Sequence, residues 1–173
     1  MIVWLEESAK NIVPELASDP DITIKEMDEA SAKVSNALAY YMKSALDNTA
    51  GEYITLNPTK LTNQSDTLTT LAHEGYPGHL YAYVYSKELG LSNLSTIMTS
   101  TAHAEGWATY VVLALYEYVI ENTEDETLVE ILEYLIANEL SSYLLEVRID
   151  LGVHYQGWGV SEVASLLKEL GYN

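Results

Sequence analysis

Residues 66–90 have the sequence DTLTTLAHEGYPGHLYAYVYSKELG, in which a helical pattern is interrupted at Pro77 and Gly78. The pattern first becomes helical near Asp66, and Gly90 is a typical residue to end a helix. Proline lacks a backbone donor and clashes with the preceding turn, whereas glycine tolerates dihedral angles that other residues avoid. The sequence therefore predicts a helical segment that is kinked or bulged at Pro77 and Gly78.

The interruption lies inside HEGYPGH, residues 73–79, which is close to the HExxH helix of zinc peptidases. In HExxH the two histidines share a helix face, and the glutamate between them activates a water molecule. Here His79 follows His73 by six residues, which places the two side chains roughly 120° apart around a regular helix. A kink could bring His79 back, so the segment predicts two metal ligands with Glu74 beside them.

Glu105 is the candidate third ligand, because catalytic zinc usually takes three protein ligands. It falls within an apolar stripe at helical spacing, formed by Met98, Thr101, Ala108, Val112, Leu115 and Val119. A buried carboxylate needs a partner, and a cation held by two imidazoles would satisfy it. A structural glutamate bonded to a tyrosine or to Arg148 is an equally open interpretation. The neighbouring Gly106 would allow another helix to approach closely.

A third cluster, RIDLGVHYQGW at residues 148–158, contains the only arginine and the last histidine. Asp150 precedes His154 by four residues and could orient its ring if the helix persists that far. Near a metal, His154 and Arg148 would suit stabilisation of an oxyanion or binding of a substrate carboxylate. Alternatively, Arg148 interacts only with the end of its helix and a nearby acid.

The remaining pattern predicts an α+β fold that is mainly helical, with a small N-terminal β-sheet packed on a helical bundle. Residues 1–173 are expected to form one domain, because no interior linker or repeat is evident. The expected strands are residues 21–27, 38–42 and 52–56, with a turn at residues 47–51. The expected additional helices are residues 2–12, residues 93–120, a helix from a capping box at Thr123 towards Arg148, and a helix from Ser161 to near Gly171.

Composition excludes several classes of function. The chain has 26 acidic and 8 basic residues, and its formal charge of −18 would repel nucleic acid and anionic lipid. Without cysteine, any metal must be held by histidine, aspartate or glutamate. No stretch has membrane-spanning length and no signal peptide is evident, so a cytoplasmic location is expected. The acidity hints at cationic substrates, although acidity more often serves solubility.

Together the three clusters resemble a bacterial family of domains of unknown function, number 885, whose members are regarded as zinc peptidases of the gluzincin type. The family pattern consists of an HExxPGH segment, an EGWAxY segment and a late RxDxGxHxxGW segment. This chain matches it at residues 73–79, 105–110 and 148–158. Family members are usually several times longer, so the chain resembles their C-terminal catalytic part.

This resemblance implies a gluzincin-like catalytic domain with one zinc ion per chain and Glu74 as general base and acid. The implied zinc ligands are His73, His79 and Glu105. Arg148 and His154 would line the site as catalytic groups, with Asp150 behind His154. His103 stands where an aromatic residue is expected, and it could add a polar group near the zinc.

Residues 53–57 could form an edge strand that pairs with an extended substrate, through Tyr53, Thr55 and Asn57. The expected function is zinc-dependent hydrolysis of a peptide or related amide bond. Alternatives are a non-catalytic metal-containing interaction domain and a helical domain without metal. A homodimer or the N-terminal portion of a longer chain could cover the cleft.

Overall fold

The structure is a computed structural model that describes residues 2–47, 51–61 and 63–172. The chain divides into two compact units, Met1–Glu121 and Asn122–Asn173, which are described separately. The fold is α+β and mainly helical, with one small N-terminal sheet, as the sequence predicts. Whether the two units act as one domain stays a prediction, and the expected turn at residues 47–51 lies largely outside the described residues.

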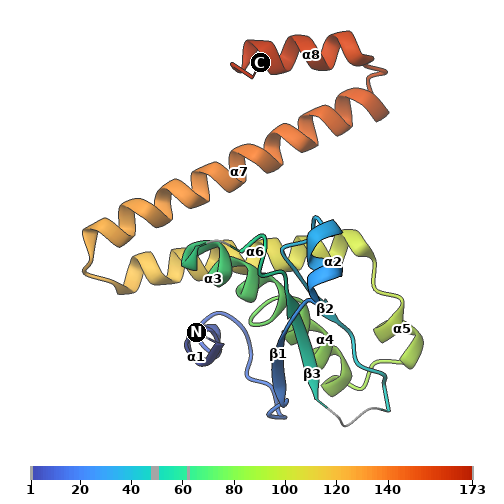
Figure 1. The fold of residues 1–173 in the computed structure, drawn as a ribbon, viewed down its shortest axis with the longest axis vertical. Coiled ribbons are helices and arrows are strands. Elements are labelled where there is room, and N and C mark those ends of the chain that lie inside the picture. Colours follow the sequence, from blue (N-terminus) through green and yellow to red (C-terminus); the bar gives the residue numbers. More distant parts are fainter. Residues whose placement is uncertain (1, 48–50, 62, 173) are drawn as a thin grey trace. The chain divides into compact units, whose positions relative to one another are not determined.

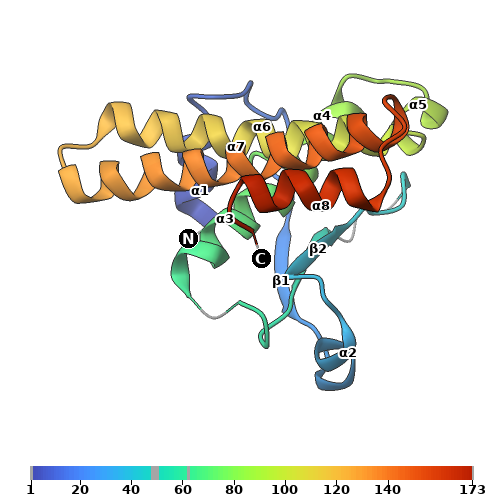
Figure 2. The same cartoon turned by 90° about the horizontal axis from the view of Figure 1, so that it is seen from above.

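Figures 1 and 2 show the order of the helices and strands along the chain. The strands are β1 (Ile22–Glu26), β2 (Ala39–Met42) and β3 (Glu52–Leu56). The helices of the first unit are α1 (Ile2–Ala9), α2 (Glu29–Val34), α3 (Gln64–Glu74), α4 (His79–Glu88), α5 (Asn93–Ile97) and α6 (Thr101–Asn122), the last of which ends at the first residue of the second unit. The second unit contains α7 (Glu126–His154) and α8 (Val160–Glu169).

The three strands form a sheet of order β1-β3-β2. Strand β1 pairs in parallel with β3, from Ile22 opposite Glu52 to Glu26 opposite Leu56, and β2 pairs antiparallel with the other side of β3. Both edges of β3, the central strand, are thus hydrogen-bonded to neighbouring strands. The prediction that residues 53–57 form an edge strand for substrate is wrong, because β3 is the central strand. Local pattern could not show this, since strand order depends on pairing between distant segments.

The three residues expected to bind substrate on that strand have contacts within the fold, and their binding of a substrate stays a prediction. The ammonium group of Lys25 lies 3.5 Å from the ring centroid of Tyr53. Thr55 pairs with residues of both neighbouring strands. Asn57 is fully buried, and its amide nitrogen donates to the carbonyl oxygens of Ala32 and Ala37 at 3.2 and 3.1 Å. Asn57 therefore holds the loop between α2 and β2 in place.

Helices α3, α4 and α6 come together beside the sheet in the first unit (Figures 1 and 2). Their shared core contains apolar side chains that are at most 2% exposed, among them Leu5, Ile54, Leu80, Tyr81, Val111 and Leu115. Burial of these side chains supplies the main driving force for bringing the helices together.

The predicted kink is a complete break between α3 and α4. The backbone nitrogen of Gly78 donates to the carbonyl oxygen of Ala72 at 3.0 Å, so the chain folds back onto the last turn of α3. The Tyr76–Pro77 peptide bond in this loop is cis. A Cβ atom on Gly78 would lie 1.8 Å from the carbonyl oxygen of His73, so only glycine fits at this position.

The expected helix at residues 93–120 is two helices, because the chain leaves helical geometry at residues 98–100. Glu105 consequently lies in the second turn of α6, and 56% of its side-chain surface is exposed. The prediction that it is buried is wrong, since the covered part of the stripe begins only at Ala108. A Cβ atom on Gly106 would meet nothing within 4 Å in the described structure. A close approach of another helix at Gly106 stays a prediction.

Two helix starts differ from the predictions by a few residues. Asp125 rather than Thr123 caps α7, because its carboxylate accepts from the backbone nitrogens of Thr127 and Leu128. Ser161 lies inside α8, which begins after Gly159. Helix α2 was not predicted at all. None of the helices that the structure describes is both long and apolar enough to cross a lipid bilayer.

The contact at Gly78 predicts a large cost for a single methyl group. Gly78→Ala should lower the free energy of unfolding by about 3 kcal/mol, because the clash is with backbone and cannot be relieved by a side-chain rotation. Gly106→Ala is the matched control and should raise stability by about 0.5–1 kcal/mol, since the position is open and helical. Denaturant unfolding of both variants measures the difference, and a Gly78→Ala protein as stable as wild type would contradict the packing.

Candidate metal centre

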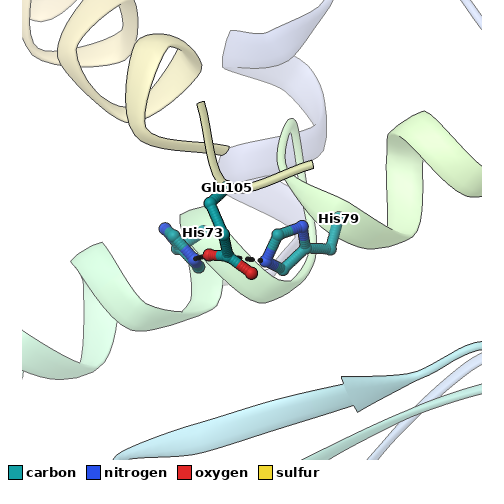
Figure 3. Close-up of side chains that lie close together, drawn as sticks. All are labelled: His73, His79 and Glu105. Carbon is teal, nitrogen blue, oxygen red and sulfur yellow. Dashed lines mark ion pairs between the residues drawn. The ribbon is translucent and has the colours of Figure 1, made fainter. Parts of the chain in front are cut away.

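Three side chains from three helices converge in the first unit (Figure 3). His73 is in the last turn of α3, His79 is the first residue of α4, and Glu105 is near the start of α6. The Nε2 atoms of His73 and His79 lie 3.4 and 3.5 Å from Oε2 of Glu105. One donor atom from each residue lies within 4.8 Å of the others. The structure thus brings together the three ligands that the sequence predicts.

The distances between the donor atoms match those expected around a small cation. Zinc binds imidazole nitrogen and carboxylate oxygen at about 2.0–2.1 Å, so neighbouring donors of a tetrahedral ion are about 3.4 Å apart. The two imidazole-to-carboxylate distances agree with this value. The donor set of two imidazoles and one carboxylate also suits zinc, and it leaves a fourth position open. The residues present therefore fit a zinc ion.

The environment of His79 favours the form that binds a metal. Burial, and next the neighbouring His73, lower the pKa of His79 below its ordinary value, although Glu74 and Glu105 oppose the change. A lower pKa keeps the imidazole neutral near neutral pH, and only the neutral ring has a free lone pair for a cation.

Trp107 connects the loop of His79 to the helix of Glu105. Its indole nitrogen donates to the carbonyl oxygen of Pro77 at 3.0 Å, and its ring stacks on Tyr81 with centroids 6.2 Å apart. Trp107 is two residues after Glu105, so this bond fixes the distance between the two ligand-bearing segments. The tryptophan of the EGWATY segment thus holds the Pro77 loop against α6, a role that the sequence motif alone does not predict.

Glu74 lies beside the three ligands without belonging to their cluster. Its Oε2 atom accepts a hydrogen bond from the backbone nitrogen of Tyr41 in β2, at 2.8 Å. This bond orients the carboxylate and leaves Oε1 without a hydrogen-bond partner among the described residues. The role of Tyr41 could not be predicted from the sequence, because the donor is a backbone group on a strand 33 residues away and has no residue signature.

A buried ionic network holds Tyr41 in place. Glu52 of β3, which is 4% exposed, accepts from the Tyr41 hydroxyl at 2.7 Å and from Nζ of Lys87 at 2.9 Å. The Ser44 hydroxyl also donates to this carboxylate at 2.8 Å. Burial, and next the bond to Glu52, raise the pKa of the Tyr41 hydroxyl well above its ordinary value. The network joins β2, β3 and α4, and so it supports the strand whose backbone donates to Glu74.

His103 is exposed at the start of α6 and lines a pocket next to the metal centre rather than joining the ligand cluster. Its predicted contribution near the zinc stays a prediction.

The late cluster forms a packed helix end in the second unit. Helix α7 continues to His154, whose Nε2 lies 3.6 Å from Oδ1 of Asp150, as the four-residue spacing predicts. The guanidinium of Arg148 lies 4.2 Å from the ring centroid of Trp158. A Cβ atom on Gly152 would lie 2.2 Å from the same ring, so glycine is needed where the tryptophan folds back.

Arg148 also donates to the side-chain oxygen of Gln156 at 3.2 Å. These contacts give the arginine a role in the helix end and differ from the predicted pairing with an acid. The action of Arg148 and His154 on a substrate stays a prediction, since both belong to the second unit.

Comparison with known proteins connects the whole chain to one family. The model of a family described as a bacterial protein of unknown function, DUF885, matches residues 4–173. No curated protein matches the chain significantly. The crystal structure of a candidate lipoprotein from Colwellia psychrerythraea is similar, with a TM-score of 0.70 and 20% identity over 96% of this chain.

At 20% sequence identity the similarity shows a shared fold only. This chain spans 28% of the length of that protein. A cytoplasmic location for the present chain stays a prediction.

The ligand geometry predicts one zinc ion per chain in the purified protein. His79→Ala should weaken zinc binding by more than about 100-fold, because even the loss of a residue that only orients a ligand commonly costs 10- to 100-fold. His103→Ala is the matched control, since His103 is exposed and outside the ligand cluster. Competition with a chromophoric chelator measures both affinities, and equal zinc binding by wild type and His79→Ala would refute the assignment.

The buried network predicts a strong dependence of stability on Lys87. Lys87→Met should lower the free energy of unfolding by about 3 kcal/mol, because it leaves the Glu52 carboxylate buried without a counter-charge. The double variant Glu52→Gln with Lys87→Met should recover part of the loss, since the amide oxygen still accepts hydrogen bonds and carries no charge. Urea unfolding of both variants tests this, and simple additivity of the Glu52→Gln and Lys87→Met effects would contradict it.

Proposed function

The chain belongs to DUF885, a family of bacterial proteins of unknown function, and from this premise we propose that it is a zinc-dependent hydrolase of peptide or related amide bonds. The observation that supports the proposal is the convergence of His73, His79 and Glu105 at the spacing of zinc ligands, with the Glu74 carboxylate beside them. Two histidines from one motif and a glutamate from a later helix correspond to a gluzincin-like arrangement.

In the proposed reaction His73, His79 and Glu105 hold the ion. A bound zinc ion lowers the pKa of water towards about 7 and polarises a substrate carbonyl. The ligand residues keep one face of the centre open, since Glu105 is more than half exposed. An amide carbonyl can therefore approach from the solvent side.

Glu74 acts as the proton carrier. Its Oε2 is occupied by the backbone N–H of Tyr41, so Oε1 takes the proton from the attacking water and then delivers it to the nitrogen of the leaving amine. The bond from Tyr41 keeps the carboxylate in one orientation during both transfers, which lowers the cost of positioning.

Arg148 and His154 are proposed to bind the substrate carboxylate or the developing oxyanion, as the sequence suggests. This part of the proposal rests on the family resemblance alone. The substrates and partners of the whole protein, including a second copy or a further portion of a longer chain over the cleft, are likewise proposals.

The function predicts that removal of the Glu74 carboxylate strongly slows turnover and leaves metal binding intact. Zinc-loaded Glu74→Gln should cleave a peptide library about 10²- to 10⁴-fold more slowly than wild type, because the amide cannot carry the proton. Its zinc content should remain one per chain, since Glu74 is not among the ligands. Glu117→Gln, the same change at an exposed position of α6, is the control and should retain full activity.

Mass spectrometry of the digests distinguishes the outcomes. Equal cleavage by wild type and Glu74→Gln would refute the assigned mechanism. Zinc retained at one per chain with no cleavage by wild type would instead favour a non-catalytic metal-containing interaction domain.

A further inference from the structure

A pocket of about 690 Å³ opens directly from the metal centre, within the first unit. The ligands His79 and Glu105 form part of its lining. Its size lies within the range of about 300–1,000 Å³ that is usual for small-molecule sites, so it has room for a large side chain together with adjoining backbone. Anything held in this pocket is next to the proposed reacting atoms.

One face of α4 forms a wall of the pocket. His79, Ala82, Tyr83 and Ser86 all line it, and their spacings of three and four residues place them on one side of the helix. The stripe starts at the metal ligand and reaches Ser86 seven residues later, which is about 10 Å along the helix axis. The start of α6, from Thr101 to Trp107, contributes further lining residues.

Three aromatic residues of the lining, Tyr81, Tyr83 and Trp107, use their polar atoms elsewhere. The Tyr81 hydroxyl donates to the carbonyl oxygen of Pro14 at 2.7 Å, and the Tyr83 hydroxyl donates to that of Ser44 at 2.5 Å. The indole nitrogen of Trp107 is bonded to the loop before α4. Because these donors are engaged, the rings of Tyr81, Tyr83 and Trp107 contribute mainly carbon surface to the pocket.

The serine on the α4 wall is also internally bonded. Ser86 donates from its hydroxyl to the carbonyl oxygen of Ala82 at 2.7 Å, within its own helix. An apolar group that enters the pocket would therefore not leave this hydroxyl without a hydrogen-bond partner.

The charges of the lining disfavour a cationic guest. Lys43 is its one lysine or arginine among the described residues, and its Nζ lies 3.4 Å from the Thr99 hydroxyl. The one acid in the same lining is Glu105, which is committed to the metal centre. A lysine or arginine side chain would meet a like charge and find no free carboxylate, despite the formal charge of −18 of the whole chain.

We propose that this pocket receives a large apolar or aromatic side chain of the substrate, next to the bond that is cut, and rejects lysine and arginine there. The inference rests on the proposed peptidase function for the identity of the occupant. It goes beyond that function because it assigns the side-chain preference to the α4 wall and to Lys43.

The test separates binding from cleavage. Binding is measured by saturation-transfer NMR with the N-acetyl amides of phenylalanine, alanine and lysine, at matched concentrations, on the full chain. The phenylalanine probe should bind at least about ten-fold more tightly than the other two, because its ring is removed from water. Ser86→Phe fills the pocket and should abolish this difference.

Ser165→Phe is the matched control. Ser165 makes the same kind of bond as Ser86, to the carbonyl oxygen four residues earlier in an exposed helix, and it is outside the lining. A folding defect that came only from replacing such a serine by phenylalanine would affect both variants. Circular dichroism of both proteins confirms that Ser86→Phe is folded before its binding is interpreted.

Cleavage of a peptide library by the zinc-loaded protein supplies the second readout. Bonds flanked by phenylalanine, tyrosine, tryptophan or leucine should be cut at least about ten-fold faster than bonds flanked by lysine or arginine, and Ser86→Phe should remove this preference. Lys43→Glu should raise cleavage beside lysine and arginine, because it exchanges a repelling charge for an attracting one.

The outcomes point to different errors. Failure of the phenylalanine probe to bind, or cleavage with no aromatic preference, overturns the pocket assignment and leaves the peptidase proposal standing if peptides are cut. A different outcome is that the phenylalanine probe binds, that Ser86→Phe abolishes this binding, and that wild type cleaves no peptide. This outcome overturns the proposed function and the assignment of the occupant as a substrate side chain. The apolar selectivity of the pocket would still stand.

Discussion

The contact between the backbone of Gly78 and the carbonyl group of His73 is the constraint on which the metal centre depends. It folds the chain back on the end of α3, so that α4 starts afresh with His79 instead of continuing the old helix. Six residues of a regular helix would point the two imidazoles about 120° apart. The break brings both Nε2 atoms to about the same distance from Glu105, at 3.4 and 3.5 Å. Trp107 then locks the loop to α6 through Pro77.

The small sheet also contributes to this site, because its residues position the Glu74 carboxylate. Glu52 on the central strand binds Lys87 of α4 and the Tyr41 hydroxyl, and the Tyr41 backbone in turn donates to Glu74. The carboxylate beside the ligands is thus positioned through a buried ion pair. In a chain with eight basic residues, Lys87 pairs with the buried Glu52 carboxylate and Lys43 lines the pocket.

Local pattern predicted the three strands to within one or two residues, and it located the break at Pro77 and Gly78. It failed where distant segments decide the outcome. Residues 53–57 have the composition of a strand, but only pairing on both sides makes β3 central. The stripe through Glu105 has helical periodicity, but its first part is not covered, so Glu105 is half exposed rather than buried. The cap of α7 lies two residues later than predicted, because Asp125 accepts from the backbone nitrogens of Thr127 and Leu128, whereas the Thr123 hydroxyl accepts from that of Asp125.

By itself, the sequence determined which groups can bind a metal and where the helix must break, because both follow from side-chain chemistry and from backbone dihedral preferences over a few residues. Only the tertiary structure decided that His73, His79 and Glu105 meet, that the backbone of Tyr41 holds Glu74, and that the adjoining pocket is aromatic with one lysine in its lining. These features join segments separated by about 25 residues or more, and packing of the shared apolar core determines which of them come into contact.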